Sequence, residues 1–464
     1  MEKSSLFRLL RALPATELRD VRKFLQSPFF NQRQDVIDLF EYLTAGGAPK
    51  KEAAWQALFS PAPFDLQKIR LLMSYLHTLL EQYISVKEQL SDPVEAKLHL
   101  LIGYRKRGMG EVFNRVYKEI EQRLEMHPLR NARYHDWRYH LQWEAHQLAY
   151  PQNPTDVSRL PDLLHTADVL YLSQKLHLGC LLVAHQTVYQ SATPETKDMD
   201  ALVARAERDG FAALPAVAIF LHCYRMLRYA DEEQHFQQFK HLLLQQSGQF
   251  SPEEMHGFYI LAVNYCIRQL NTGGERFFSE ALLLYKEGLA KGYLFENGQL
   301  SRFSYHNIVA AGLQSGELDW VRYFIHEFKN RLEKRYRESS FSFNLARLEY
   351  AQKRYGSVLE LLQKANYRDP LLNLAAKTLL LKTYYETDEY DLLQSHLDAM
   401  RNYLHRKRVI GYHRTNYLNI IRYTEKITRL NPLDKKSIAS LRQAIEQEEV
   451  LTEKGYLLKA ISVY

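Results

Sequence analysis

The chain has 464 residues, of which 46% are hydrophobic and 25% are charged, and its formal net charge at pH 7 is +7. These fractions match ordinary globular proteins and exclude a disordered, a collagen-like or a membrane-spanning chain. The longest apolar stretch, residues 211–221, is interrupted by Pro215 and is far shorter than the roughly 20 residues that a bilayer span requires.

Residues 1–92 form a block of short predicted helices. Apolar residues recur at helical spacing in three segments separated by prolines, 6–13, 18–25 and 36–43. Asn31, with Gln34 three residues later, resembles a capping box and predicts the start of the third helix. A longer helix is expected from about Asp65 to residue 91. The third helix is acidic, which argues against contact with DNA phosphates. We therefore interpret the block as an N-terminal helical subdomain that caps the fold or docks a partner.

An internal repeat organises the middle of the chain. Leu227, Leu270 and Leu313 are 43 residues apart, and the residues that precede each of them align with one another. One period earlier, Cys180 falls in the same column as Cys223 and Cys266. A period of this size fits a helical hairpin that cannot cover its own apolar face, so neighbouring hairpins must stack.

The period shortens near residue 340, where Leu318, Tyr355 and Tyr390 are separated by 37 and then 35 residues. The section 341–404 resembles the tetratricopeptide repeat (TPR), whose period is 34. The matching residues are Leu345 and Ala346 on the first helix, Tyr355 at the start of the second, Ala365 near its end and Pro370 at the close of the unit, followed by Leu379, Tyr384 and Tyr390 in the next unit. Ser342, Ala346 and Val358 depart from the family pattern. The resemblance implies a groove that binds peptides or proteins, with no catalysis of its own.

The expected fold is all-α, because no stretch alternates between apolar and polar residues as a strand would. We predict a right-handed α-solenoid of TPR-like helical hairpins, with periods of 35–43 residues, over residues 93–430. The N-terminal helical subdomain, 1–92, precedes it and C-terminal capping helices, 431–464, follow it. Ser251 carries the clearest helix-start signal, since Pro252 and Glu254 come after it.

The N-terminus and the cysteines bear on the compartment. The first residues contain no apolar run long enough for a signal peptide, so we expect a cytoplasmic protein with no membrane partner. Three cysteines in one column of a helical repeat are too regularly placed for a disulfide framework. Stacked helices about 8–10 Å apart hold such residues beyond bridging distance. We interpret them as small apolar side chains in a reducing environment.

No constellation of residues meets the requirements of a catalytic, cofactor or metal site. His326-Glu327 begins like a zinc-protease motif, but asparagine stands at the fifth position. Residues 103–109 have the glycine spacing of a phosphate loop without its lysine. The histidines around Trp137 do not share a helix face at metal-binding spacing, so we expect them to pack between helices. We predict no enzyme activity, no cofactor and no metal.

One segment, 401–430, concentrates positive charge. Its eight Lys and Arg residues oppose only Glu425, which makes +7, as large as the formal charge of the whole chain. Tyrosines and amides are interleaved with these cations and can stack on or hydrogen-bond a bound chain. The predicted partner-binding residues are Arg401, Arg406, Lys407, Arg408, Tyr412, Arg414, Tyr417 and Arg422. Three interpretations stay open: an acidic protein or peptide, a nucleic-acid backbone, or a solvated surface.

Our leading hypothesis is a non-catalytic scaffold or adaptor that binds a partner peptide or protein on the solenoid surface. The alternative is a nucleic-acid-binding or regulatory protein that uses the basic aromatic segment 401–430. Clustered cations would make binding to either partner sensitive to salt.

Overall fold

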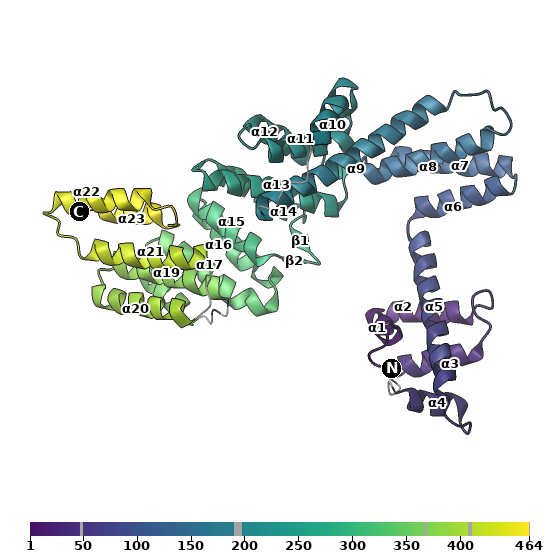
Figure 1. Ribbon diagram of the computed structural model, residues 1–464, viewed down its shortest axis with the longest axis horizontal. Helices are drawn as coiled ribbons and strands as arrows, with labels where there is room; N and C mark the ends of the chain where they lie inside the picture. Colours follow the sequence, from purple (N-terminus) through teal and green to yellow (C-terminus); the bar gives the residue numbers. More distant parts are fainter. Residues whose placement is uncertain (47–49, 190–196, 365–366, 368, 407–410, 464) are drawn as a thin grey trace. The chain divides into compact units, whose positions relative to one another are not determined.

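A computed structural model describes residues 1–46, 50–189, 197–364, 367, 369–406 and 411–463. Within these residues the chain forms 23 α-helices that pack as neighbouring pairs, three short 3-10 segments and one two-stranded hairpin (Figure 1). The prediction of an all-α protein is confirmed. The chain divides into two compact units, one made of residues 1–175 and 204–217 and the other of residues 176–203 and 218–464.

Five helices at the N-terminus share one hydrophobic core. They are α1 (Ser5–Ala12), α2 (Ala15–Gln26), α3 (Gln34–Thr44), α4 (Lys51–Phe59) and α5 (Leu66–Ser91). Leu25, Leu39 and Leu76, which come from three of these helices, are completely buried in it. The apolar residues noted at helical spacing in α1, α2, α3 and α5 supply much of this core, whereas α4 was not predicted. Asp92 accepts hydrogen bonds from the amides of Val94 and Glu95 and so separates α5 from the next helix.

Two predicted helix starts had different outcomes. At Ser251 the capping box is confirmed: its hydroxyl accepts from the Glu254 amide at 3.2 Å, and the Glu254 carboxylate accepts from the Ser251 amide at 2.9 Å. At Asn31 the prediction is wrong, since α3 begins at Gln34 and Arg33 precedes it. The Asn31 side chain instead donates to the carbonyls of Leu25 and Arg33 and holds the turn between α2 and α3. An asparagine amide bonds to the nearest free carbonyls, and the sequence does not say which these are.

A second helical group completes the first unit. Its helices are α6 (Pro93–Lys106), α7 (Gly110–Met126) and α8 (Ala132–Ala149), which pack on one another around Leu101, Ile120 and Trp137. Two further helices, α9 (Leu160–Tyr189) and α10 (Lys197–Arg208), contribute residues to both units.

The second unit continues as successive helix pairs. In chain order the helices are α11 (Pro215–Arg228), α12 (Glu233–Gln245), α13 (Pro252–Asn271), α14 (Phe277–Ala290), α15 (Arg302–Gln314), α16 (Leu318–Glu327), α17 (Lys334–Ala351), α18 (Tyr355–Lys364), α19 (Pro370–Glu386), α20 (Tyr390–Arg406), α21 (Tyr412–Thr428), α22 (Lys435–Gln447) and α23 (Lys454–Ile461). Each helix contacts the next along most of this order, and α17 also contacts both α15 and α19. The first helices of these three pairs therefore lie beside one another.

The residues aligned by the repeat occupy matching places. Cys180, Cys223, Cys266 and Val309 lie in α9, α11, α13 and α15, and each is at most 1% exposed. The three residues aligned at spacings of 37 and 35 also occupy equivalent positions. Leu318, Tyr355 and Tyr390 are the first residues of α16, α18 and α20. Ala365, one of the residues matched to the TPR family, lies outside the described residues.

One turn geometry joins the two helices of four pairs. Gly273, Gly316, Lys353 and Asp388 all have positive φ, between 57° and 93°. In each turn the next amide donates to the carbonyl five residues earlier; Glu317 to Gly312 (2.9 Å), Arg354 to Glu349 (2.9 Å) and Glu389 to Tyr384 (3.0 Å) are examples. This bond belongs to the Schellman motif, which ends a helix with a left-handed residue. Since the motif is specified within a few residues, it recurs with the repeat.

A short β-hairpin interrupts the helices after α14. Strands β1 (Phe295–Glu296) and β2 (Gln299–Leu300) pair antiparallel around Asn297 and Gly298, whose φ values are 50° and 75°. Asn-Gly is the preferred pair for a two-residue hairpin turn, because both positions need positive φ. This hairpin was not predicted, because strands of two residues are too short to display alternation.

The five helices α19 to α23 share a hydrophobic core. Leu374 and Leu397 lie in it together with Ile445 and Leu457 from the segment predicted to cap the chain.

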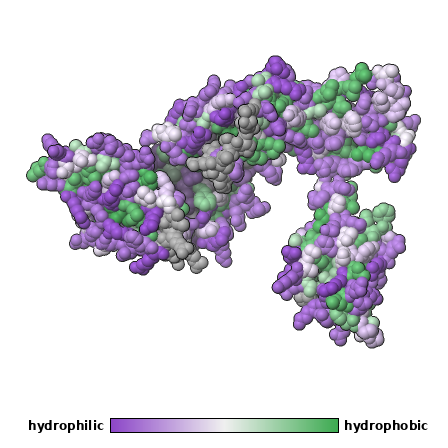
Figure 2. All heavy atoms as spheres, viewed as in Figure 1, coloured by the Kyte–Doolittle hydropathy of each residue, from purple (hydrophilic) through white to green (hydrophobic). Residues whose placement is uncertain are grey.

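Hydrophilic residues predominate on the face drawn in Figure 2, with hydrophobic residues in scattered patches. No helix in the described part of the chain combines the length and the apolar character needed to cross a bilayer.

Candidate functional site

A groove of about 650 Å³ lies in the second unit, where first helices of successive pairs come side by side. Its lining comes from α15, α17, α19, α21 and the segment that leads into α23: Leu313, Gln314, Phe343, Arg347, Tyr350, Ala351, Ala375, Thr378, Leu379, Lys382, Tyr417, Ile420, Thr452 and Glu453. Four helices that are separate in sequence therefore present one continuous surface, and its volume is in the range of ligand sites.

Three polar side chains in this groove occupy equivalent places in the repeat. Arg347, Lys382 and Tyr417 are each 35 residues apart and lie on α17, α19 and α21. Phe343 and Thr378, also 35 residues apart, line the groove one helical turn before Arg347 and Lys382. Because equal spacing puts equivalent positions on the same face of successive helices, the period itself produces the groove lining.

Arg347 is the unusual charge in the groove. Its guanidinium donates to the backbone carbonyl of His306 at 3.1 Å and to the side-chain oxygen of Asn344 at 3.2 Å. Burial lowers the pKa of Arg347 to about 10, so it stays protonated at neutral pH. No carboxylate of the described residues forms an ion pair with it. The Glu453 carboxylate, which lines the same groove, offsets part of this cost through its charge but does not contact the guanidinium as an ion pair. A half-buried cation whose direct hydrogen-bond partners are neutral is only partly compensated.

Lys382, by contrast, is compensated. Its ammonium group forms an ion pair with Glu453 at 2.8 Å and lies over the rings of Tyr350 and Tyr456, 5.6 Å and 4.7 Å from their centroids. Burial raises the pKa of Tyr417 to about 12, which keeps its hydroxyl neutral and able to donate. Two cations and one carboxylate leave the groove with a net charge of +1, and Arg347 is the cation that forms no ion pair with the carboxylate.

The chemistry available in the groove is that of recognition. Phe343, Leu379 and Ile420 supply apolar contact area, and Tyr350 and Tyr417 add rings with polar ends. Arg347 presents a planar set of donors whose geometry matches a carboxylate.

The eight residues predicted from the basic segment do not form one cluster in the described part of the structure. Arg401 pairs with Asp398 at 2.7 Å and with Glu425 at 2.6 Å, and Arg422 pairs with Glu448 at 2.7 Å. Arg406, Tyr412 and Arg414 are exposed, whereas Lys407 and Arg408 lie outside the described residues. Tyr417 lines the groove described above, and Arg422 lines a different recess between α21 and α22.

Arg347 and Lys382 were not among the predicted site residues, although a signal for them existed. They lie in the TPR-like section and share the 35-residue register with Tyr417. The predicted site residues lie where positive charge is dense along the sequence, whereas Arg347 is an isolated arginine within a helix. Whether such an arginine is paired depends on the carboxylates near it, and the packing of other helices determines which carboxylates these are.

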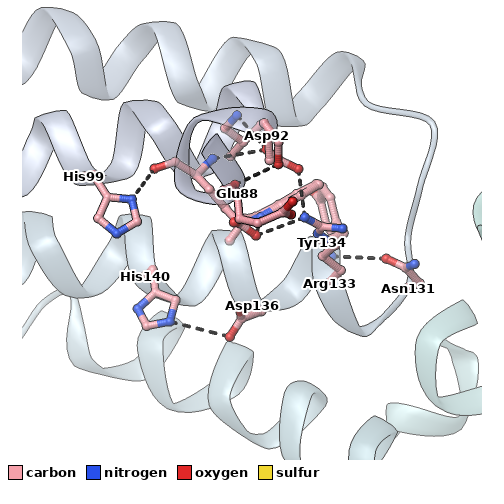
Figure 3. A network of polar contacts seen from close by, with 12 residues as sticks. Glu88, Asp92, His99, Asn131, Arg133, Tyr134, Asp136 and His140 are labelled. Atoms are coloured by element: carbon pink, nitrogen blue, oxygen red, sulfur yellow. Dashed lines mark hydrogen bonds and ion pairs between the residues drawn. The ribbon is translucent and has the colours of Figure 1, made fainter. Parts of the chain in front are cut away.

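The histidines around Trp137 contribute to packing and local hydrogen bonds. His135 is buried, His140 lies 3.6 Å from Asp136, and the His99 ring lies 2.9 Å from the Glu95 carbonyl (Figure 3). Arg133 on α8 bridges Asp92 and Glu95 at 3.1 Å and 3.0 Å, which ties α8 to the start of α6. Among the residues with described positions, no three His, Cys, Asp or Glu side chains gather as a metal site would require.

The three cysteines are free and buried. The Cys180 thiol donates to the Phe220 carbonyl at 3.3 Å, and burial raises its pKa well above the ordinary value. A buried thiol with a raised pKa is a poor nucleophile, which fits a role in packing.

Comparisons of the chain with family models, with curated proteins and with solved structures found no match.

Proposed function

We propose that this chain is a non-catalytic interaction protein, built as a TPR-like α-solenoid, that binds an extended acidic peptide segment of a partner protein in the groove between α15 and α23. The observation that carries the proposal is Arg347, a half-buried cation that forms no ion pair with any described carboxylate and lies among apolar and aromatic side chains. A partner carboxylate would pair with this guanidinium, and the partner's apolar side chains would cover Phe343 and Leu379. Binding would therefore relieve the cost of a half-buried cation.

The solenoid component of the proposal rests on regularity. Consecutive helices pack as neighbours, four turns share one left-handed geometry, and equivalent residues recur at the starts of α16, α18 and α20. A regular array of hairpins presents equivalent side chains along one surface, and an extended chain is the ligand that contacts several of them at once.

A second candidate function, nucleic-acid binding, is supported by Arg406 and Arg414, which are exposed and have no ion-pair partner among the described residues. Both lie outside the lining of the groove. The two candidates are therefore separable by substitution.

Selection from a displayed peptide library tests the leading proposal. We expect Asp or Glu to be enriched at one position beside apolar residues, and we expect Arg347→Gln to weaken the selected peptides by at least about tenfold, the effect of losing one charge-assisted hydrogen-bonded pair. Arg347→Lys, which keeps the charge without the planar donors, should fall between wild type and Arg347→Gln.

Arg406→Gln serves as the matched control, because it removes an exposed arginine outside the groove. Peptides that bind Arg347→Gln as well as wild type, with its far-UV circular dichroism unchanged, would refute the groove as the binding site. Tight binding of single-stranded RNA that Arg406→Gln and Arg414→Gln abolish would instead support the second candidate.

A further inference from the structure

A second recess, separate from the peptide groove, lies between α21 and α22. Its volume is about 680 Å³, and four cations line it: Arg422, Lys426 and Arg429 from the α21 side and Lys436 from α22. The only carboxylate in the lining is Glu425. The recess is thus strongly positive, whereas the peptide groove carries a net charge of +1.

Helix geometry explains why the cations converge. Arg422, Lys426 and Arg429 are spaced by four and three residues, so they follow one face of α21 over roughly 10 Å. Lys436 faces them from the first turn of α22, where a second lysine, Lys435, also lies and no acidic residue is present. Lys436 thus lies at the positive end of α22, which the Asp434 carboxylate caps, while Lys426 lies in the last turn of α21.

Most of these cations form no ion pair within the described part of the chain, although the Lys426 ammonium group lies over the Tyr423 ring, 5.9 Å from its centroid. Glu425 is already paired with Arg401 at 2.6 Å, and Arg422 is paired with Glu448 at 2.7 Å. Asp434 is engaged as the cap of α22, where it accepts from the Ser437 amide. Lys426, Arg429 and Lys436 form no ion pair with any carboxylate whose position is described. Three cations therefore line the recess without forming an ion pair, and its one carboxylate, Glu425, is already paired with Arg401.

We propose that this recess binds a compact polyanion that carries clustered phosphate groups. Each phosphate monoester brings nearly two negative charges and several acceptor oxygens, so two or three of them satisfy the free cations and the Ser440 hydroxyl together. The lining contains no aromatic side chain on which successive bases of a nucleic-acid strand would stack. The proposal is independent of the peptide groove, which shares no lining residue with this recess.

Titration calorimetry of the full chain with inositol hexakisphosphate tests the proposal. We expect saturable binding of one equivalent that weakens steeply as salt rises. The variant Lys426→Gln/Arg429→Gln/Lys436→Gln, whose three sites are exposed, should lower the affinity by at least about tenfold. The control Lys3→Gln/Arg8→Gln/Lys23→Gln removes the same net charge at exposed positions of the first unit, and we expect it to stay within about twofold of wild type.

The outcomes separate the possible ligands. Binding to vesicles that contain phosphatidylinositol bisphosphate, lost in the same triple variant, would identify a lipid headgroup as the source of the phosphates, whereas binding to the soluble probe alone would identify a free metabolite. The proposal is overturned by an absence of saturable binding, by an equal loss in both triple variants, or by tighter binding of a single-stranded RNA than of the phosphate probe. Arg347 does not line this recess, so Arg347→Gln should leave phosphate binding unchanged. Failure of the phosphate proposal and failure of the peptide proposal are therefore distinguishable.

Discussion

Buried histidines couple the stability of this chain to pH. His135 on α8 is 9% exposed, and its pKa is lowered to about 4, chiefly by burial and then by the positive charges of Arg138, His165 and Arg130. His306 behaves in the same way beside Arg347, with a pKa of about 4. A lowered histidine pKa means that the unfolded chain binds a proton before the folded chain does. The stability contributed by each neutral imidazole is therefore complete above about pH 6.5 and declines as the pH falls toward 4.

At the residue scale, we predict that His135→Gln reduces the sensitivity of stability to acid. Between pH 7 and pH 4.5 the protonation of His135 in the unfolded state costs wild type about 2 to 3 kcal/mol, and the glutamine variant avoids this loss. The measurement is the thermal midpoint by circular dichroism at both pH values. His140→Gln, at an exposed site on the same helix, is the control and should follow wild type. An equal fall in the midpoint for all three proteins would contradict the prediction.

At the scale of the helix pair, close packing depends on the absence of a side chain at Gly312. A Cβ atom added there would lie 2.3 Å from Cγ2 of Val321, which is fully buried on α16. Gly257 on α13 provides the contrast, because a Cβ atom there would meet nothing within 4 Å. The two glycines thus share a helical backbone and differ in what surrounds them.

We predict opposite effects for alanine at these two positions. Gly312→Ala should lower the free energy of unfolding by about 1 to 3 kcal/mol through overpacking, whereas Gly257→Ala should raise it by up to about 1 kcal/mol through helix propensity. Urea denaturation measures both. Adding Val321→Ala to Gly312→Ala removes the clashing methyl group. The double variant should therefore lose less free energy of unfolding than the sum of the losses in the two single variants. Stabilisation by Gly312→Ala alone would show that α16 shifts freely.

At the scale of the whole molecule, the hydrophobic interior is divided into separate clusters. One contains Leu76 and its neighbours from α1 to α5, and another contains Leu397 and its neighbours from α19 to α23. The two clusters share no residue, and they belong to different compact units. Stability is therefore expected to be regional, as it is where each element contacts only its neighbours.

We predict that core truncations act locally. Leu76→Ala and Leu397→Ala each remove a fully or nearly fully buried side chain and should cost about 2 to 5 kcal/mol in their own region. Hydrogen exchange with mass spectrometry should show faster exchange within residues 1–91 for the first variant and within residues 374–461 for the second. Each variant serves as the control for the other. Faster exchange throughout the chain in either variant would mean that the clusters unfold as one.

The sequence by itself determined the helical class and several helix starts. These features depend on residues near one another in the chain: the capping box at Ser251 closes within four residues, and the second helices begin at the expected Leu318, Tyr355 and Tyr390. The Asn-Gly turn at Asn297 carried an equally local signal, although the strands around it were too short to reveal it.

Only the tertiary structure decided which charges are compensated. Lys382 pairs with Glu453, 71 residues away, and Arg401 and Arg422 pair with carboxylates 24 and 26 residues away, whereas Arg347 and Lys426 have no such partner among the described residues. The sum of charges over a segment does not contain this information. The electrostatic free energy of a charged side chain depends on the groups within a few ångströms of it. The packing of helices that are distant in sequence determines which groups those are.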